Sequence, residues 1–152
     1  MNALVVYDSK FGNTRQIAEA IGGALGDRYD VSLQPVTDQP EVTQAISLLL
    51  VGGPTHAHGI SQPMRQFLDN LPKDAVSNVA VATFDTRFHK PKLIVGAASD
   101  GIAKRLRKRG ARIVTEPESF WVESGEGPLS AGEVERARTW ARTLASADVP
   151  TG

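Results

Sequence analysis

The sequence contains no cysteine in its 152 residues, which excludes disulfide bonds, thiolate metal sites and thiol catalysis. It also lacks a net charge, because 17 basic residues balance 17 acidic residues, so no overall field attracts nucleic acid or an anionic membrane. No stretch approaches the roughly 20 apolar residues needed to cross a bilayer. The sequence enters an apolar segment directly, without a basic region or a cleavage-site pattern. We therefore expect a cytoplasmic protein with no nucleic-acid partner and no membrane insertion.

The remaining composition is typical of a soluble globular protein, with 41% hydrophobic and 22% charged residues. A chain of this length fits one domain that can bury a substantial core. We expect this domain to span residues 1–148 and to be followed by a short tail at 149–152.

Apolar strand-like segments alternate with helical patterns along the whole chain. Strands are predicted near 2–7, 30–36, 46–52, 76–84 and 111–122, and helices near 14–27, 61–71, 93–109 and 130–146. This alternation predicts an α/β fold, a three-layer doubly wound parallel sheet with right-handed crossovers. Pro117 interrupts the fifth strand, which predicts a break or an edge position there. Trp121 and Trp140 are predicted to be packing residues.

The junction between the first strand and the first helix is the most informative segment. Residues 8–14 carry hydroxyls at Ser9 and Thr14, an amide at Asn13 and a conformationally permissive Gly12. A helix N-terminus leaves its first N–H groups unpaired and carries partial positive charge, so this loop can hold a phosphate-sized anion. It matches neither a Walker loop nor a dinucleotide fingerprint. An ordinary turn and helix cap use the same residue types, but the carboxyl end of a parallel strand is where ligands bind.

Two further loops leave strands at the same edge of the predicted sheet, at residues 52–60 and 83–91. Both contain ring-sized side chains beside hydroxyls and backbone N–H groups, as required to hold a flat heteroaromatic ring with polar edges. All three histidines of the chain fall in these loops: His56, His58 and His89.

Simpler interpretations of the same residues remain open at this stage. His56 and His58 can be an incidental surface pair. A zinc site would need a third protein ligand besides these two histidines; Asp85 could be invoked, but this interpretation is disfavoured. Phe84 can be a plug over the core instead of a wall of a binding site.

Together the three loops resemble the flavodoxin-like family, through Asp-Ser-Lys-Phe-Gly-Asn-Thr (8–14), Gly-Gly-Pro-Thr-His-Ala-His-Gly (52–59) and Ala-Thr-Phe-Asp-Thr-Arg-Phe (82–88). The resemblance covers essentially the whole chain and implies a five-stranded parallel sheet in the order 2-1-3-4-5, with FMN as the ligand. It implies no catalytic residue and no metal ligand. The implied cofactor-binding residues are Ser9, Lys10, Phe11, Gly12, Asn13, Thr14, Pro54, Thr55, His56, Ala57, His58, Gly59, Phe84, Asp85, Thr86, Arg87 and Phe88.

The chain departs from electron-carrier flavodoxins at the walls of the implied flavin site. His56 stands where such carriers generally have a tryptophan, and Arg87 or Phe88 stands where they have a tyrosine, so either His56 or Phe88 can stack on the ring. Carriers are strongly acidic and this chain is neutral. Cations near a reduced, anionic flavin raise its potential, which disfavours a very low-potential carrier. The cation-prone side chains in these loops are His56, His58, Arg87, His89 and Lys90.

The sequence therefore predicts an FMN-binding flavodoxin-like protein that passes electrons to a redox partner protein or a small-molecule electron acceptor. Two alternatives are kept. One is an enzyme, a flavodoxin-type NAD(P)H:quinone or related oxidoreductase. The other is a non-redox binding module that has lost FMN. An electron-transfer flavoprotein is favoured over a stand-alone oxidoreductase, because the short chain shows no evident nicotinamide pocket.

Overall fold

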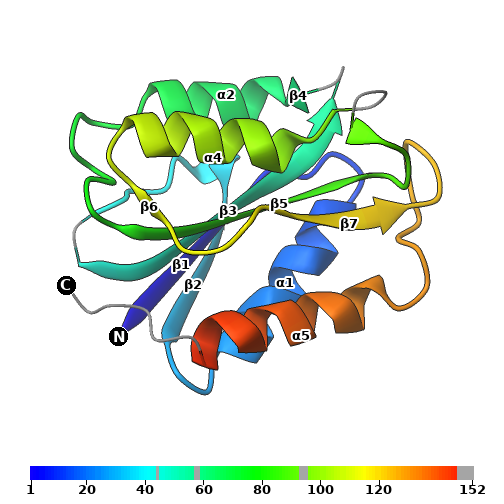
Figure 1. Cartoon of the computed structure of the whole chain (residues 1–152), viewed down its shortest axis with the longest axis horizontal. Coiled ribbons are helices and arrows are strands. Elements are labelled where there is room, and N and C mark those ends of the chain that lie inside the picture. The colour runs from blue at the N-terminus through cyan, green and yellow to red at the C-terminus, as the bar shows by residue number, and fades with distance from the viewer. Residues whose placement is uncertain (44, 57–58, 93–95, 147–152) are drawn as a thin grey trace.

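The structure is a computed structural model that describes residues 1–43, 45–56, 59–92 and 96–146. Strands and helices alternate along it, as the sequence predicts (Figure 1). The strands are β1 (Asn2–Tyr7), β2 (Asp30–Pro35), β3 (Ile46–His56), β4 (Gly59–Ile60), β5 (Ala80–Phe88), β6 (Arg112–Ile113) and β7 (Glu118–Val122). The helices are α1 (Asn13–Leu25), α2 (Gln62–Asp69), α4 (Ala98–Lys108) and α5 (Glu133–Ser146), with a 3₁₀ turn η1 at Val36–Asp38.

The strands form one parallel sheet in the order β2-β1-β3-β5, and β6 and β7 both pair with β5 at its far edge. β4 is a short antiparallel addition to the end of β3. Because β6 and β7 are two halves of the fifth predicted strand, the predicted order 2-1-3-4-5 is confirmed. The predicted interruption is confirmed too, since Pro117 lies between the two halves and cannot donate a hydrogen bond to the ladder.

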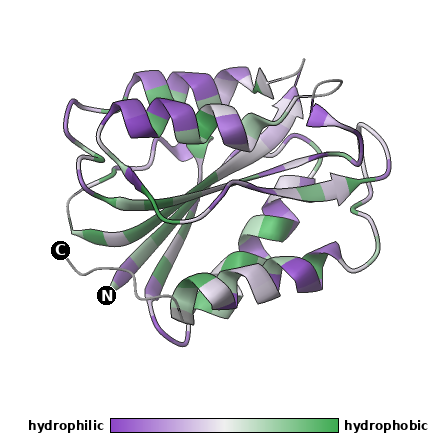
Figure 2. Ribbon diagram, viewed as in Figure 1, coloured by the Kyte–Doolittle hydropathy of each residue, from purple (hydrophilic) through white to green (hydrophobic). Residues whose placement is uncertain are grey.

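Helices cover both faces of the sheet, α1 and α5 on one side and α2 and α4 on the other (Figure 1). Successive side chains of a strand point to opposite faces, so both faces of β1 are apolar. Ala3, Val5 and Tyr7 pack in the core with α1 and α5, whereas Leu4 and Val6 pack in the core with α2 and α4. Figure 2 shows the hydrophobic strands inside and hydrophilic positions along the outer sides of the helices.

Two strands extend further toward the edge formed by their carboxyl ends than the sequence predicts. β3 continues to His56 instead of ending near 52, and β5 runs over 80–88 instead of 76–84. The reason is continued pairing: β5 remains bonded to β3 as far as Thr86 and to β7 as far as Phe88. Residues that the sequence assigns to loops therefore lie in extended strand, so their side chains alternate between the two faces of the sheet.

Candidate functional site

A cleft of about 240 Å³ opens at the carboxyl ends of the strands, at the edge predicted from the sequence. The loop after β1 forms one end, and the last residues of β3, β5 and β7 form its walls. Its lining consists of Ser9, Lys10, Phe11, Asn13, Thr14, Pro54, Thr55, His56, Thr86, Arg87, Phe88, Val122 and Gly125. The fold thus brings residues from all three predicted loops together in one place.

The loop after β1 has the geometry of an anion site. Gly12 is the residue before α1 and adopts a left-handed φ of 92°, which glycine tolerates at little cost. The N–H groups of Gly12 and Arg15 both donate to the Ser9 hydroxyl, at 3.1 and 3.2 Å. The N–H groups of Asn13 and Thr14, at the first two helical positions, donate to no acceptor among the described residues. Four N–H groups of one short segment are therefore unpaired or held only by a hydroxyl.

Thr14 links this loop to the neighbouring wall of the cleft. Its buried hydroxyl hydrogen-bonds to the hydroxyl of Thr86, near the end of β5, over 2.8 Å. A hydroxyl can donate one hydrogen bond and accept two, so each of these groups retains capacity for a ligand. Lys10 and Phe11 lie at the mouth, where the Phe11 ring is 48% exposed and the Lys10 ammonium lies 5.3 Å from its centre.

The wall from β3 consists of Pro54, Thr55 and His56. Thr55 accepts a hydrogen bond from the backbone N–H of Ala98 over 3.1 Å, which ties this wall to the start of α4. His56 is exposed and lines the cleft. Gly59 pairs with His56 in β4 but does not line the cleft. Two further residues of the predicted set, Ala57 and His58, lie outside the described residues.

The wall from β5 contains Thr86, Arg87 and Phe88, but the fold turns the two preceding predicted residues away from the cleft. Phe84 is fully buried in the core, where its ring lies 6.2 Å from that of Trp140. It is therefore the core plug allowed for in the sequence analysis and forms no wall of the cleft. Asp85 is also fully buried and does not line the cleft. Phe88 is 38% exposed and offers an aromatic ring at the mouth.

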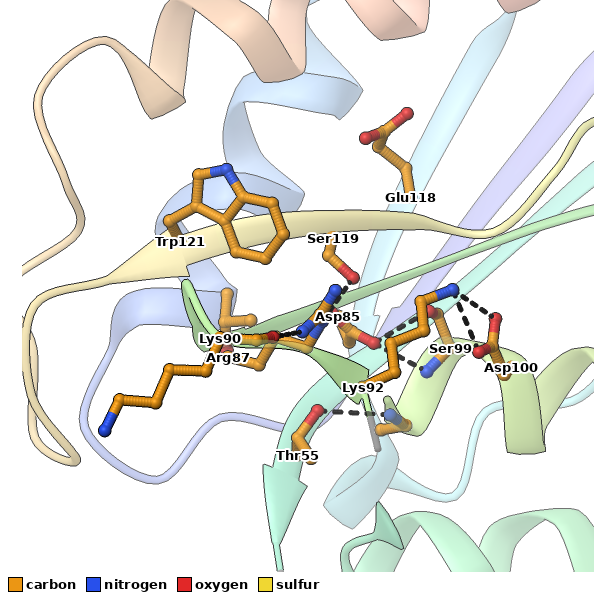
Figure 3. Close-up of polar contacts among 12 residues, drawn as sticks. Thr55, Asp85, Arg87, Lys90, Lys92, Ser99, Asp100, Glu118, Ser119 and Trp121 are labelled. Carbon is orange, nitrogen blue, oxygen red and sulfur yellow. Dashed lines mark hydrogen bonds and ion pairs between the residues drawn. The ribbon is translucent and has the colours of Figure 1, made fainter. Parts of the chain in front are cut away.

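Arg87 is held in a fixed position at the cleft (Figure 3). Its Nε donates to the Ser119 hydroxyl at 2.8 Å and its Nη1 donates to the Lys90 carbonyl at 2.7 Å. Its guanidinium carbon lies 4.7 Å from the centre of the Trp121 ring. Trp121 thus packs at the back of the site, as predicted, with one further partner in the stacked ring of His89 at 4.3 Å.

Asp85 lies next to Arg87, and its buried carboxyl group is close to the cleft. Its Oδ2 accepts hydrogen bonds from the backbone N–H and the hydroxyl of Ser99, at 2.9 and 2.7 Å. Its Oδ1 lies 3.9 Å from Nε of Arg87. Burial raises the pKa of Asp85 above its ordinary value, although the hydrogen bonds from Ser99, the nearby Ser119 hydroxyl and the charge of Arg87 oppose this shift.

A third wall was missed in the sequence analysis. Val122, at the end of β7, and Gly125, in the loop that follows, both line the cleft. The Asn13 side-chain amide donates to the backbone carbonyl of Glu126 at 3.1 Å, so this loop is joined to the loop after β1. A signal for it was present, because the loop after the fifth strand of a parallel sheet leaves at the same edge as the others.

A salt-bridge network fixes β7, and hence this wall, to α5. Glu133 is 6% exposed and accepts hydrogen bonds from the Trp121 backbone N–H at 2.8 Å and from Nη2 of Arg136 at 2.6 Å. Burial by itself raises the pKa of Glu133, but these hydrogen bonds and the charge of Arg136 outweigh it, so the pKa is lowered. Arg136 also pairs with Glu118 at the start of β7, at 2.9 Å.

Within the described part of the chain, no group of three or more His, Cys, Asp or Glu side chains is placed to hold a metal ion. Among the helices described, none has the length and apolar character needed to span a membrane.

Comparison with known proteins agrees with this geometry. A family model described as the flavodoxin domain matches residues 4–114. This chain belongs to the flavodoxin domain family. No curated protein sequence matches it significantly.

Solved flavodoxins share the fold of this flavodoxin domain over nearly its whole length. A flavodoxin from the domain Archaea superposes with a TM-score of 0.77 at 23% identity, covering 95% of this chain and 96% of its own. Oxidised flavodoxin 2 from Bacillus cereus gives 0.76 at 25% identity, covering 95% and 98%. Rubredoxin oxygen:oxidoreductase from Desulfovibrio gigas gives 0.73 at 20% identity, covering 95% of this chain and 35% of that larger one.

Proposed function

We propose that the cleft binds FMN noncovalently and that the chain transfers electrons through it. Flavodoxin-domain membership and the similarity to solved flavodoxins support a flavodoxin-type electron-transfer protein. The bound flavin supplies the redox chemistry, while the protein supplies binding, orientation and electrostatics. No catalytic acid, base or nucleophile is needed for this function.

The observation that carries the proposal is the set of backbone N–H groups at one end of the cleft. Gly12 and Arg15 direct theirs at a single point, which the Ser9 hydroxyl occupies, and those of Asn13 and Thr14 are unpaired among the described residues. A phosphate oxygen is a stronger acceptor than a hydroxyl, and the N-terminus of α1 adds partial positive charge. This donor set fits the phosphate of FMN.

The other end of the cleft fits the flavin ring. His56 from β3 and Phe88 from β5 place flat side chains on its walls. A volume near 240 Å³ is close to the lower limit of about 300 Å³ for small-molecule sites, so part of a tricyclic ring would reach solvent. An accessible ring edge suits electron exchange with a redox partner protein or a small-molecule acceptor.

The charges around this site differ from those expected from the sequence. Lys10 and Lys90 are exposed and have no ion-pair partner among the described residues, whereas Arg87 lies beside a carboxylate. The electrostatic field that stabilises reduced FMN therefore depends on exposed cations, whose charge is screened by salt, and on the protonation state of Asp85. His56 adds charge only when it is protonated.

The enzyme alternative, a flavodoxin-type NAD(P)H:quinone or related oxidoreductase, has one observation in its favour. Lys10 is an exposed cation that lines the cleft beside the Phe11 ring, and such a surface attracts an anionic, aromatic substrate such as NADPH. The expectations of a cytoplasmic location and of a domain ending near 148 also remain predictions.

Two measurements on purified protein loaded with FMN separate these functions. Reversible anaerobic reduction by dithionite, with no bleaching of the flavin by NADPH, supports the electron carrier. Rapid bleaching by NADPH, followed by reoxidation with a quinone, supports the enzyme. Failure to take up FMN at all supports the binding module that has lost its cofactor and contradicts the proposal.

A further inference from the structure

Asp85 is an ionisable residue whose carboxyl group is buried close to the cleft. It is fully buried on β5, directly before two residues that line the cleft. Ser99 satisfies Oδ2 twice, but Oδ1 has no hydrogen-bond partner among the described residues. Burying a charged oxygen without a hydrogen bond is costly unless an opposite charge lies close by.

That opposite charge is Arg87, whose Nε is 3.9 Å from Oδ1 of Asp85. Arg87 is only 7% exposed and is one of the residues that line the cleft, so solvent screens its charge poorly there. Ser119 and the Lys90 carbonyl accept its hydrogen bonds, and Trp121 packs against its plane (Figure 3). A cation held so firmly acts on a ligand in the cleft at constant distance, and so does its neighbouring carboxylate.

We propose that Asp85 is a positioning residue and the counter-charge of Arg87, and that this pair sets the preference of the cleft for oxidised over reduced flavin. This inference rests on the proposed FMN function. With Asp85 ionised the pair is neutral, and reduced, anionic FMN gains little from Arg87. Without the carboxylate the full charge of Arg87 faces the ligand, and reduced FMN binds more tightly.

The pair also explains why a substitution of Arg87 alone would mislead. Burial raises the pKa of Asp85, and loss of the guanidinium removes one of the causes that oppose this rise. Asp85 in an Arg87→Gln variant therefore takes up a proton more readily. The position is then neutral because the carboxyl group is protonated, and the effect of losing the Arg87 charge is hidden. The informative change is Asp85→Asn, which keeps the shape and removes the charge.

The experiment compares wild type, Asp85→Asn and the double variant Asp85→Asn/Arg87→Gln, each saturated with FMN. The quantity measured is the ratio of the dissociation constants for oxidised and reduced FMN, obtained from midpoint potentials of bound and free FMN. Asp100→Asn is the matched control, because it removes an acid paired with Lys92 at 3.0 Å on the surface of α4 (Figure 3).

We expect Asp85→Asn to increase the relative affinity for reduced FMN at least tenfold, which corresponds to about 30 mV for a two-electron couple. The control and the double variant stay within threefold of wild type. If Asp85→Asn does not fold, the double variant still tests the inference. If Asp85 did not neutralise Arg87, removing the Arg87 charge would weaken the binding of reduced FMN tenfold relative to oxidised FMN.

An unchanged ratio in Asp85→Asn, an equal shift in Asp100→Asn, or a tenfold loss in the double variant overturns the inference. Each of these outcomes requires that FMN binds, so they leave the proposed function intact. Absence of FMN binding by wild type overturns both.

Discussion

The Thr14 hydroxyl provides a direct test of whether the loop after β1 holds a phosphate. It is buried and 2.8 Å from the hydroxyl of Thr86, and it can donate to a phosphate oxygen while accepting from Thr86. Thr14→Val preserves the branched shape and removes only the hydroxyl. The effect on FMN can therefore be separated from the effect on packing by comparison with riboflavin, which has the same ring and no phosphate.

The expected losses of stability and of FMN affinity follow from the two hydrogen bonds that Thr14→Val removes. Losing the bond to Thr86 and leaving that buried hydroxyl unpaired lowers the free energy of unfolding by about 1–3 kcal/mol. Losing a charge-assisted bond to the phosphate costs about 1.5–3 kcal/mol of binding free energy, or roughly 10- to 150-fold in affinity. Riboflavin affinity changes by less than about threefold, because only the shared ring contacts remain.

The assay is a fluorescence titration of both flavins with each variant, together with urea unfolding of the flavin-free protein. Thr139→Val serves as the matched control, since its hydroxyl bonds to the Glu135 carbonyl on the exposed face of α5. Equal loss of FMN and riboflavin affinity in Thr14→Val, or no loss of either, would refute the assignment of this loop to a phosphate.

Two further predictions test the parts that position the cleft. Glu133→Gln should lower the free energy of unfolding by about 1–3 kcal/mol at pH 7, because it removes the carboxylate bound by Arg136 and the Trp121 N–H. The lowered pKa means that this stability is present above the ordinary value of 4.5 and is lost as pH falls through the folded-state pKa. The gap to wild type should thus close in acid unfolding curves, and a pH-independent gap would contradict the argument. Gly52→Ala would place a Cβ 2.3 Å from the Phe84 ring and should lower the free energy of unfolding by at least about 1–3 kcal/mol. Adding Phe84→Leu should recover part of this loss, and thermal unfolding that shows no recovery would contradict this packing.

The fold and the general position of the cleft could be predicted because they depend on short-range patterns. Apolar segments of strand length alternate with helical periodicity, and parallel strands place their carboxyl ends at a common edge. The break at Pro117 followed from one missing N–H group, and the structure confirms it. These predictions do not depend on which side chains contact one another in the folded protein.

The orientation of individual side chains at the site could not be predicted, because it depends on pairing between distant strands. Phe84, the expected last residue of the strand, pairs with Gly52, and β5 continues to pair past it, which places Asp85 inside the protein. The ion pair of Arg87 arises from the same register. The Asn13–Glu126 hydrogen bond spans 113 residues of sequence, and no local pattern signals it.

The most direct test of the proposed function is an equilibrium titration of the flavin-free protein with FMN, followed by flavin fluorescence, with riboflavin in parallel. The proposal predicts saturation at one FMN per chain and an affinity for riboflavin at least tenfold weaker, since riboflavin leaves the N–H groups of Gly12, Asn13 and Thr14 without an anion. Absence of FMN binding, or equal affinity for the two flavins, would contradict it.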